Sequence, residues 1–215
     1  MKTKGSVAAI LLASGFSERF NKRNKLLLPF RTGRKAADLE AKPLARYTLE
    51  LAAGMDFSGG IYFVAASEDV AALAADLRTI RVVKNTAPEK GLRESVRLGL
   101  QACGLEACGL EACPAVDYFL FFPCDEPFLD KGTVQRILDE RKPGCIVEPR
   151  YRGRPGNPCL FSAAFRDELL ALNEGETPKL IKTRYPQALR AVEVTDPLVL
   201  EDIDNEEDFK RLSRY

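Results

Sequence analysis

The sequence predicts an α/β protein with a mostly parallel central sheet between two layers of helices and one small β-arm. Two observations predict these three layers. Short apolar segments suited to strands alternate along the chain with longer segments of helical spacing. The first strand-like segment, residues 7–13, also lacks polar alternation, which is typical of a strand buried on both faces of a parallel sheet. At 215 residues, the chain is expected to form a single domain, 1–215.

The expected elements begin with Val7–Ala13, an unbroken apolar run. Residues 116–122 give the strongest strand signal and are expected at the centre of the sheet, because most of them are apolar and aromatic. Further strands are expected at 61–65, 81–84, 145–150, 157–161 and 189–194. The strands at 145–150 and 157–161, joined by residues 151–156, are expected to form the β-arm. Helices are expected at about 43–53, 68–78, 132–141, 162–172 and 177–185, after the loop at 89–95, and from about 206.

Composition excludes several classes of function. With 32 basic and 31 acidic residues the net charge is +1, which provides no global field for nucleic acid or an anionic membrane. The N-terminal apolar run is too short to span a membrane, so the protein is expected in the cytoplasm. Histidine is absent, which excludes Ser-His, Cys-His and His–zinc chemistry. Phosphoryl and nucleotidyl transfer remain, since they depend mainly on positioning and electrostatics.

The loop after the first strand suggests a nucleoside triphosphate site. Ser14 and Gly15 end the strand, and small residues let backbone N–H groups approach an anion closely. Arg19 and Lys25 follow at a distance that allows the loop to fold over that anion. The loop matches neither G-x-x-x-x-G-K-[ST] nor G-x-G-x-x-G, so a P-loop or dinucleotide-binding protein is not expected. An ordinary turn with solvated charges is the alternative.

Two later positions are expected at the same edge of the sheet. Ser95 lies near the start of a helix, where its hydroxyl could face the crevice or only cap the helix. Asp125 follows the central strand at 116–122, where a carboxylate could hold Mg²⁺ against a triphosphate or simply shape a turn. Glu126 is expected to cap that turn or to face solvent.

The β-arm concentrates positive charge in an otherwise balanced chain. Arg150, Arg152 and Arg154 occur close together with Gly153 and Gly156. Arginine side chains suit phosphate, although solvated arginines on a plain hairpin are the alternative.

A short repeat places Cys103, Cys108 and Cys113 five residues apart. Steps of five spread side chains around a helix axis, and the spacing misses the usual zinc and iron–sulfur patterns. We interpret the repeat as a small tandem duplication in a surface connection. The six cysteines are expected to be free thiols.

The N-terminal motif, Leu12-Ala13-Ser14-Gly15-Phe16-Ser17-x-Arg19 with residues 24–30 (NKLLLPF), resembles the signature of a nucleotidyltransferase superfamily, typified by the molybdenum cofactor cytidylyltransferases. The S-V-x-x-G-L helix, the D-x-P turn, the G-N-P segment and the D-I-D segment follow in that family's order. The resemblance implies a Rossmann-like, GT-A-like fold. It also implies roles for particular residues: catalysis by Lys25, Arg19 and Asp125; nucleotide binding by Leu12, Ala13, Ser14, Gly15, Phe16, Ser17, Gly91 and Ser95; acceptor binding by Arg154, Gly156, Asn157 and Pro158; and Mg²⁺ binding by Asp125 and Asp204.

The implied activity is that of a CTP:molybdopterin cytidylyltransferase, which joins a nucleotide to a phosphorylated pterin cofactor and releases pyrophosphate. The base is less clearly indicated, because Ser14 stands where cytidylyltransferases usually have Ala and guanylyltransferases usually have Gly. Pro123-Cys124-Asp125 resembles the guanylyl branch, whereas residues 24–30, 94–96 and 156–158 favour CTP. The alternatives are a guanylyltransferase, a sugar-phosphate or polyol-phosphate nucleotidyltransferase, and a non-catalytic chaperone that delivers cofactor to a molybdenum hydroxylase.

Overall fold

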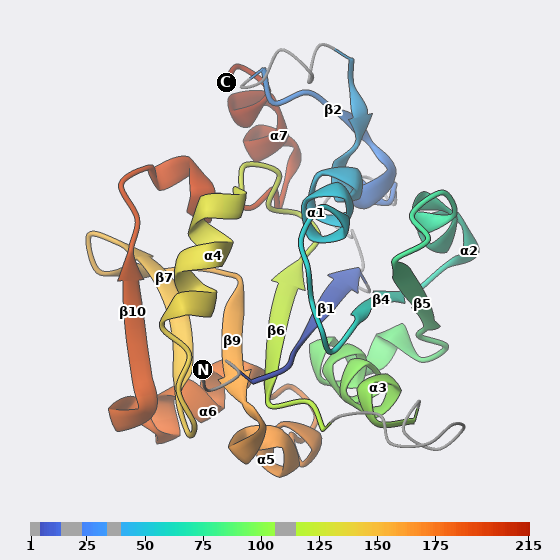
Figure 1. The fold of residues 1–215 in the computed structure, drawn as a ribbon. Coiled ribbons are helices and arrows are strands. Elements are labelled where there is room, and N and C mark those ends of the chain that lie inside the picture. Colours follow the sequence, from blue (N-terminus) through green and yellow to red (C-terminus); the bar gives the residue numbers. More distant parts are fainter. Residues whose placement is uncertain (1–4, 14–22, 34–39, 106–114) are drawn as a thin grey trace.

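A single eight-stranded sheet forms the centre of the protein (Figure 1). The computed structural model describes residues 5–13, 23–33, 40–105 and 115–215. The strand order is β10-β7-β9-β6-β1-β4-β5, with β8 paired to β7. β9 is antiparallel to both of its neighbours, while β6, β1, β4 and β5 run parallel, as do β10 and β7. The strands are β1 Val7–Ala13, β4 Ile61–Ala65, β5 Ile80–Lys84, β6 Tyr118–Pro123, β7 Ile146–Tyr151, β8 Arg154–Pro155, β9 Cys159–Ser162 and β10 Leu189–Glu193.

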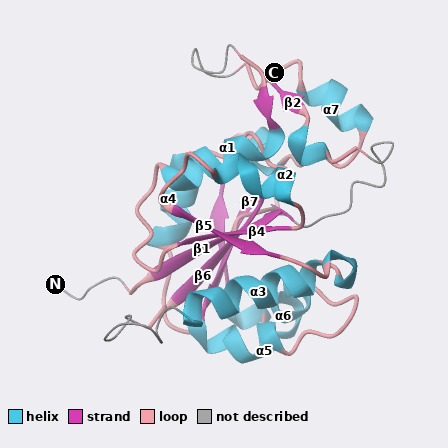
Figure 2. Ribbon diagram, turned by 90° about the vertical axis from the view of Figure 1, so that its right-hand side faces the viewer, coloured by secondary structure: helices cyan, strands magenta, loops and turns pink. Residues whose placement is uncertain are grey.

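Helices cover both faces of the sheet, which confirms the predicted three layers (Figure 2). One layer holds α1 (Leu44–Ala53), α2 (Glu68–Ala71) and α4 (Lys131–Asp139), and the other holds α3 (Leu92–Leu105), α5 (Arg166–Leu170) and α6 (Pro178–Arg184). β1 contributes to both cores, because Ala9 and Leu11 pack on one side and Ala8 and Ile10 on the other. No helix in the described part of the chain is long and apolar enough to cross a membrane.

A third apolar cluster joins the C-terminal part of the chain to a small second sheet. That sheet pairs β2 (Pro29–Phe30) with β3 (Lys42–Pro43), and α7 (Glu206–Leu212) packs beside it. Phe30 and Ile203 are both fully buried in this cluster. The cluster therefore brings the segment after β1 and the segment before α7 to the same edge of the main sheet.

Three predicted elements differ from those observed. The helix expected at 68–78 is the single turn of α2 followed by a 3-10 turn at Ala72–Ala74, because the chain must turn to begin β5 at Ile80. The helix expected at 162–172 likewise starts as a 3-10 turn before α5. The strand expected at 157–161 is β9, which belongs to the main sheet. The β-arm is the β7–β8 hairpin, whose turn has positive φ at Arg152 (49°) and Gly153 (84°).

We expect Gly99→Ala to destabilise the protein, although alanine favours helices more than glycine does by about 1 kcal/mol. A Cβ at Gly99 in α3 would lie 2.4 Å from Ile10 Cγ2 in β1, and overpacking of this kind costs roughly 1–3 kcal/mol. Urea unfolding gives the free-energy change. Gly104→Ala in the same helix is the control, because its Cβ would meet only the mobile end of Arg166 at 3.3 Å. Equal stabilisation by both changes would contradict this packing argument.

Candidate functional site

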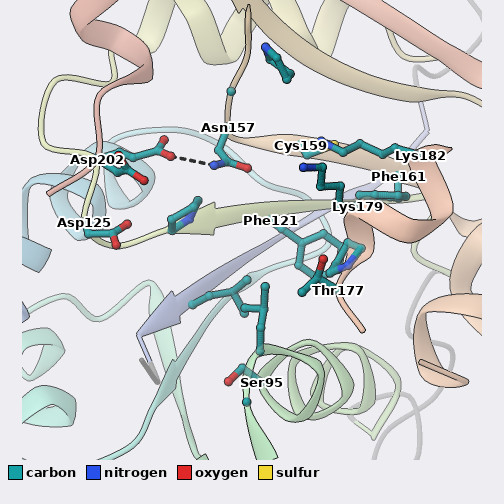
Figure 3. Close-up of a pocket in the computed structure, with 18 of the residues that line it drawn as sticks. Ser95, Phe121, Asp125, Asn157, Cys159, Phe161, Thr177, Lys179, Lys182 and Asp202 are labelled. Carbon is teal, nitrogen blue, oxygen red and sulfur yellow. Dashed lines mark hydrogen bonds between the residues drawn. The ribbon is translucent and has the colours of Figure 1, made fainter. Parts of the chain in front are cut away.

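A pocket of about 570 Å³ lies on the sheet face that α3 and α6 cover (Figure 3). Its floor includes Leu12 of β1, Phe121 of β6 and Phe161 of β9. Its walls come from α3, α6, the loop after β6 and the segment between β8 and β9. This is the edge where α/β sheets commonly bind ligands. The predicted site residues that line it are Leu12, Gly91, Ser95, Asp125, Gly156 and Asn157.

Lys25 holds together two distant parts of the chain at one end of this pocket. It begins the 3-10 turn Lys25–Leu27, which the Asn24 side chain caps by accepting a hydrogen bond from Leu26 N. The Lys25 ammonium donates to Asp125 Oδ2 (2.7 Å), Asp204 Oδ1 (3.0 Å) and the carbonyl oxygen of Ile203 (2.7 Å). The Ile203 amide in turn donates to the Asp125 carbonyl at 3.1 Å. Three residues implied by the resemblance are therefore in direct contact.

The electrostatic surroundings keep Lys25 charged. Its side chain is only 13% exposed, and this burial by itself would lower its pKa. The charges of Asp125 and Asp204 and their hydrogen bonds outweigh that effect, so the pKa of Lys25 is raised above its ordinary value. The site thus holds a fixed positive charge between two carboxylates.

The oxygen atoms around Lys25 fit a hard divalent cation. Two carboxylate oxygens and one carbonyl oxygen lie 2.7–3.0 Å from a single point, the Lys25 Nζ. Mg²⁺ prefers oxygen ligands and commonly takes one or two carboxylates together with substrate phosphates and water. Within the described ranges, no group of three His, Cys, Asp or Glu side chains could hold a metal by itself. A cation here would therefore depend on Asp125 and Asp204 and would have to displace the Lys25 ammonium.

Two further carboxyl groups, those of Glu126 and Asp202, line this end of the pocket, and the position of Glu126 differs from the one expected. Glu126 was expected to cap a turn or face solvent, but it is only 4% exposed, in a segment where Cys124 and Phe128 are also buried. Burial, and then the charge of Asp125, raise the pKa of Glu126 well above its ordinary range. Burial, followed by the charges of Asp204 and Asp125, also raises the pKa of Asp202. Carboxyl groups are therefore crowded at this end, and burial together with their mutual repulsion favours the neutral forms of Glu126 and Asp202.

The opposite wall carries the residues predicted to bind the nucleotide. Gly91 precedes α3 with φ +75°, a conformation that favours glycine, and Ser95 is fully buried with its hydroxyl accepting from Asn85 Nδ2 at 3.2 Å. Figure 3 shows Ser95 across the pocket from Asn157. Ala13 is buried at the end of β1. Ser14, Gly15, Phe16, Ser17 and Arg19 lie outside the described residues.

Some residues in and after the β-arm line the pocket, and others make contacts outside it. Gly156 is required for close packing, because a Cβ there would lie 2.3 Å from Leu200 Cδ2. Asn157 lines the pocket, and Pro158 after it is buried. The structure does not bring Arg154 to the pocket wall, since its guanidinium pairs with Glu201 at 2.6 Å.

The other two arginines of the arm also have partners outside the pocket. Arg150 pairs with the buried Glu148 at 2.9 Å, and Arg152 lies over the Tyr151 ring. The charge concentration noted in the sequence is therefore distributed among local contacts.

Sequence reasoning missed the contribution of α6 to the pocket. Thr177, Lys179 and Lys182 line it, and the Lys182 ammonium donates to Glu148 Oε2 at 2.7 Å. The available signal was the spacing of the two lysines, which places them on one face of a helix.

Comparison with known proteins identifies the family. The chain is 25% identical to nicotine blue oxidoreductase from Paenarthrobacter nicotinovorans over 218 residues, covering 96% of each chain. Its fold matches Rv0371c from Mycobacterium tuberculosis H37Rv with a TM-score of 0.74 at 23% identity, over 99% of this chain and 100% of that one. A complex of Rv0371c with manganese matches with a TM-score of 0.69 at 24% identity, over 97% and 98% of the two chains.

A third relative is molybdopterin-guanine dinucleotide biosynthesis protein A from Archaeoglobus fulgidus, with a TM-score of 0.65 at 16% identity over 97% of both chains. At such identities the solved structures establish the shared fold alone. The family model for the MobA-like NTP transferase domain matches residues 9–190, which is most of the chain. The protein therefore belongs to the MobA-like NTP transferase family and is a nucleotidyltransferase.

Proposed function

We propose that this nucleotidyltransferase is a CTP:molybdopterin cytidylyltransferase, which forms the molybdopterin cytosine dinucleotide cofactor and releases pyrophosphate. The observation that carries the proposal is the convergence of Lys25, Asp125 and Asp204 beside a pocket of about 570 Å³. That volume is within the usual range for a small-molecule site. Ser95 and Asn157, which the family resemblance relates to nucleotide and acceptor, lie on opposite walls (Figure 3).

In the proposed reaction, a terminal phosphate oxygen of the pterin attacks the α-phosphorus of CTP. The bond from the α-phosphorus to the bridging oxygen breaks, and pyrophosphate leaves with that oxygen. The two pocket walls would hold the reacting groups in line, which is the main catalytic requirement of such a transfer. Lys25, together with Arg19 and the backbone amides of residues 14–17, would neutralise the charge that develops on pyrophosphate.

Asp125 and Asp204 would hold Mg²⁺, since their oxygen atoms and the Ile203 carbonyl surround one point. A bound divalent cation supplies charge neutralisation for the phosphates and a template for their orientation. The chain itself supplies Lys25 as the positive charge that occupies this point in the structure.

Pyrophosphate release with CTP or GTP, each with and without molybdopterin, tests the proposal. We expect release to require molybdopterin and to be faster with CTP, by a modest factor, because strong discrimination needs several buried hydrogen bonds to the base. Ser14→Gly is expected to shift the preference toward GTP. Faster release with GTP by the unchanged protein would assign it to the guanylyl branch. Release with a sugar phosphate or polyol phosphate, but not with molybdopterin, would contradict the proposed acceptor.

A second candidate activity is that of an oxidoreductase whose substrate packs against the aromatic rings of the pocket floor. It is supported by the likeness to nicotine blue oxidoreductase and by the aromatic rings of Phe121 and Phe161 in the pocket floor. Oxidation of NADH or NADPH in the presence of a quinone dye, without any pyrophosphate release, would favour it over nucleotidyl transfer.

A further inference from the structure

Glu126 and Asn157 form a contact in the pocket wall that the proposed reaction does not use. Glu126 belongs to the turn after β6, and Asn157 lies 31 positions later, between β8 and β9. The Asn157 amide nitrogen donates to Glu126 Oε1 at 2.7 Å. Both residues line the pocket, and Asn157 is labelled in Figure 3.

This contact determines which way the Asn157 amide faces. Glu126 Oε1 accepts from the Asn157 NH₂ group, either as a carboxylate oxygen or as the carbonyl oxygen of the neutral carboxyl group. The amide oxygen consequently lies on the other side and points into the pocket, as Figure 3 shows. Gly156 and Pro158 restrain the backbone on either side, because Gly156 packs against Leu200 and Pro158 is buried. The pocket therefore presents a hydrogen-bond acceptor of fixed direction.

The position of Glu126 is unfavourable for stability. Its Oε2 is buried and has no hydrogen-bond partner in the described part of the chain. The side chain also lies close enough to Asp125 and Asp202 to experience their negative charges. A buried polar group without a partner usually destabilises a protein, and replacing such a group with an apolar one is often neutral or stabilising. Stability alone therefore does not explain a carboxyl group in the pocket wall.

We propose that Glu126 is a positioning residue, which fixes the Asn157 amide so that its oxygen accepts a hydrogen bond from an N–H or O–H group of the acceptor substrate. The proposal rests on the proposed function for the identity of that substrate. Glu126 acts through Asn157 and selects acceptors that present a donor at this point. The nucleotide on the Ser95 wall is unaffected.

Three single variants and one double variant test the proposal. Glu126→Gln retains an acceptor for the Asn157 NH₂ group, whereas Glu126→Met removes it with little change in volume. Asn157→Ala removes the amide itself. The double variant carries both Glu126→Met and Asn157→Ala. We expect Glu126→Met to raise KM for molybdopterin about tenfold, the value of one hydrogen bond, with KM for CTP unchanged. Glu126→Gln should restore most of the loss.

The double variant separates positioning from an independent role. If Glu126 acts through Asn157, the double variant should have the same KM for molybdopterin as Asn157→Ala alone. Glu126→Met should melt at the same temperature as the unchanged protein or higher, which a residue with only a structural role would not allow. Additive effects on KM, or a rise in KM for CTP of the same size, would overturn the proposal.

Nuclear magnetic resonance of protein labelled with ¹⁵N-asparagine gives a readout that needs no turnover. We expect a side-chain NH₂ signal, assigned by its loss in Asn157→Ala, to be protected from exchange in the unchanged protein and in Glu126→Gln. Protection should be lost in Glu126→Met, and its persistence there would overturn the proposal. If no triphosphate supports transfer, the proposed function fails, while this signal still decides whether Glu126 positions Asn157.

Discussion

Asp125→Asn is expected to slow nucleotidyl transfer about 100-fold or more while leaving the melting temperature nearly unchanged. Replacing a metal-ligand carboxylate removes charge at the reacting phosphates, and even groups that only support such ligands are typically worth 10–100-fold. The change weakens the ion pair with Lys25, but Asp204 and the Ile203 carbonyl still hold that ammonium. It also relieves repulsion between Asp125 and the nearby Glu126 and Asp202, so the two effects on stability should largely cancel. Initial rates of pyrophosphate release and thermal unfolding give the two measurements.

Asp69→Asn is the matched control for this substitution, because Asp69 is an exposed residue at the start of α2. It makes the same chemical change away from the pocket and should leave the rate unaltered. Turnover by Asp125→Asn at the unchanged rate would remove Asp125 from the mechanism.

Lys25→Ala is expected to have two opposite effects. Transfer should slow by about 100-fold, because a positive charge near the leaving pyrophosphate is lost. Divalent cations should bind at least about tenfold more tightly in the absence of nucleotide, because the ammonium no longer occupies the point between Asp125 and Asp204. Calorimetric titration with Mn²⁺ and Mg²⁺ measures the second effect without any turnover.

Lys84→Ala is the control for this change, since Lys84 makes an exposed ion pair with Glu68. It should alter neither transfer nor cation binding. Weaker cation binding in Lys25→Ala would show that the lysine supports the cation site, in contradiction of the competition that we expect.

The layers of the fold could be predicted because their signals are local. β1 is apolar at every position, and the structure buries its successive side chains on opposite faces of the sheet. The two-residue strands β2 and β3 could not be predicted, because they are too short for any periodicity to appear. The short α2 also departs from its helical pattern, because the position of β5 determines where the chain turns.

The sequence indicated residues of the candidate site but not the contacts among them. The sequence and the family resemblance indicated Lys25, Asp125 and Asp204, but neither showed that the lysine lies between the two carboxylates. The contact of Glu126 with Asn157 could not be predicted either, because the two residues lie 31 positions apart in the sequence. Arg154 looked suitable for phosphate, and its partner Glu201 lies 47 positions away.

The separation of 179 positions between Lys25 and Asp204 has a consequence for synthesis on the ribosome. Chains emerge from the N-terminal end at about 5–20 residues per second, so β1, β4 and β6 can pair well before Asp204 is available. A partly synthesised chain could therefore have most of the sheet while Lys25 still lacks one of its two carboxylates. Ribosome-bound chains stalled before residue 202 should fold much of the sheet but bind divalent cations poorly. Completion of the site would therefore follow the pairing of β1, β4 and β6, which delays cation binding until Asp204 has been synthesised.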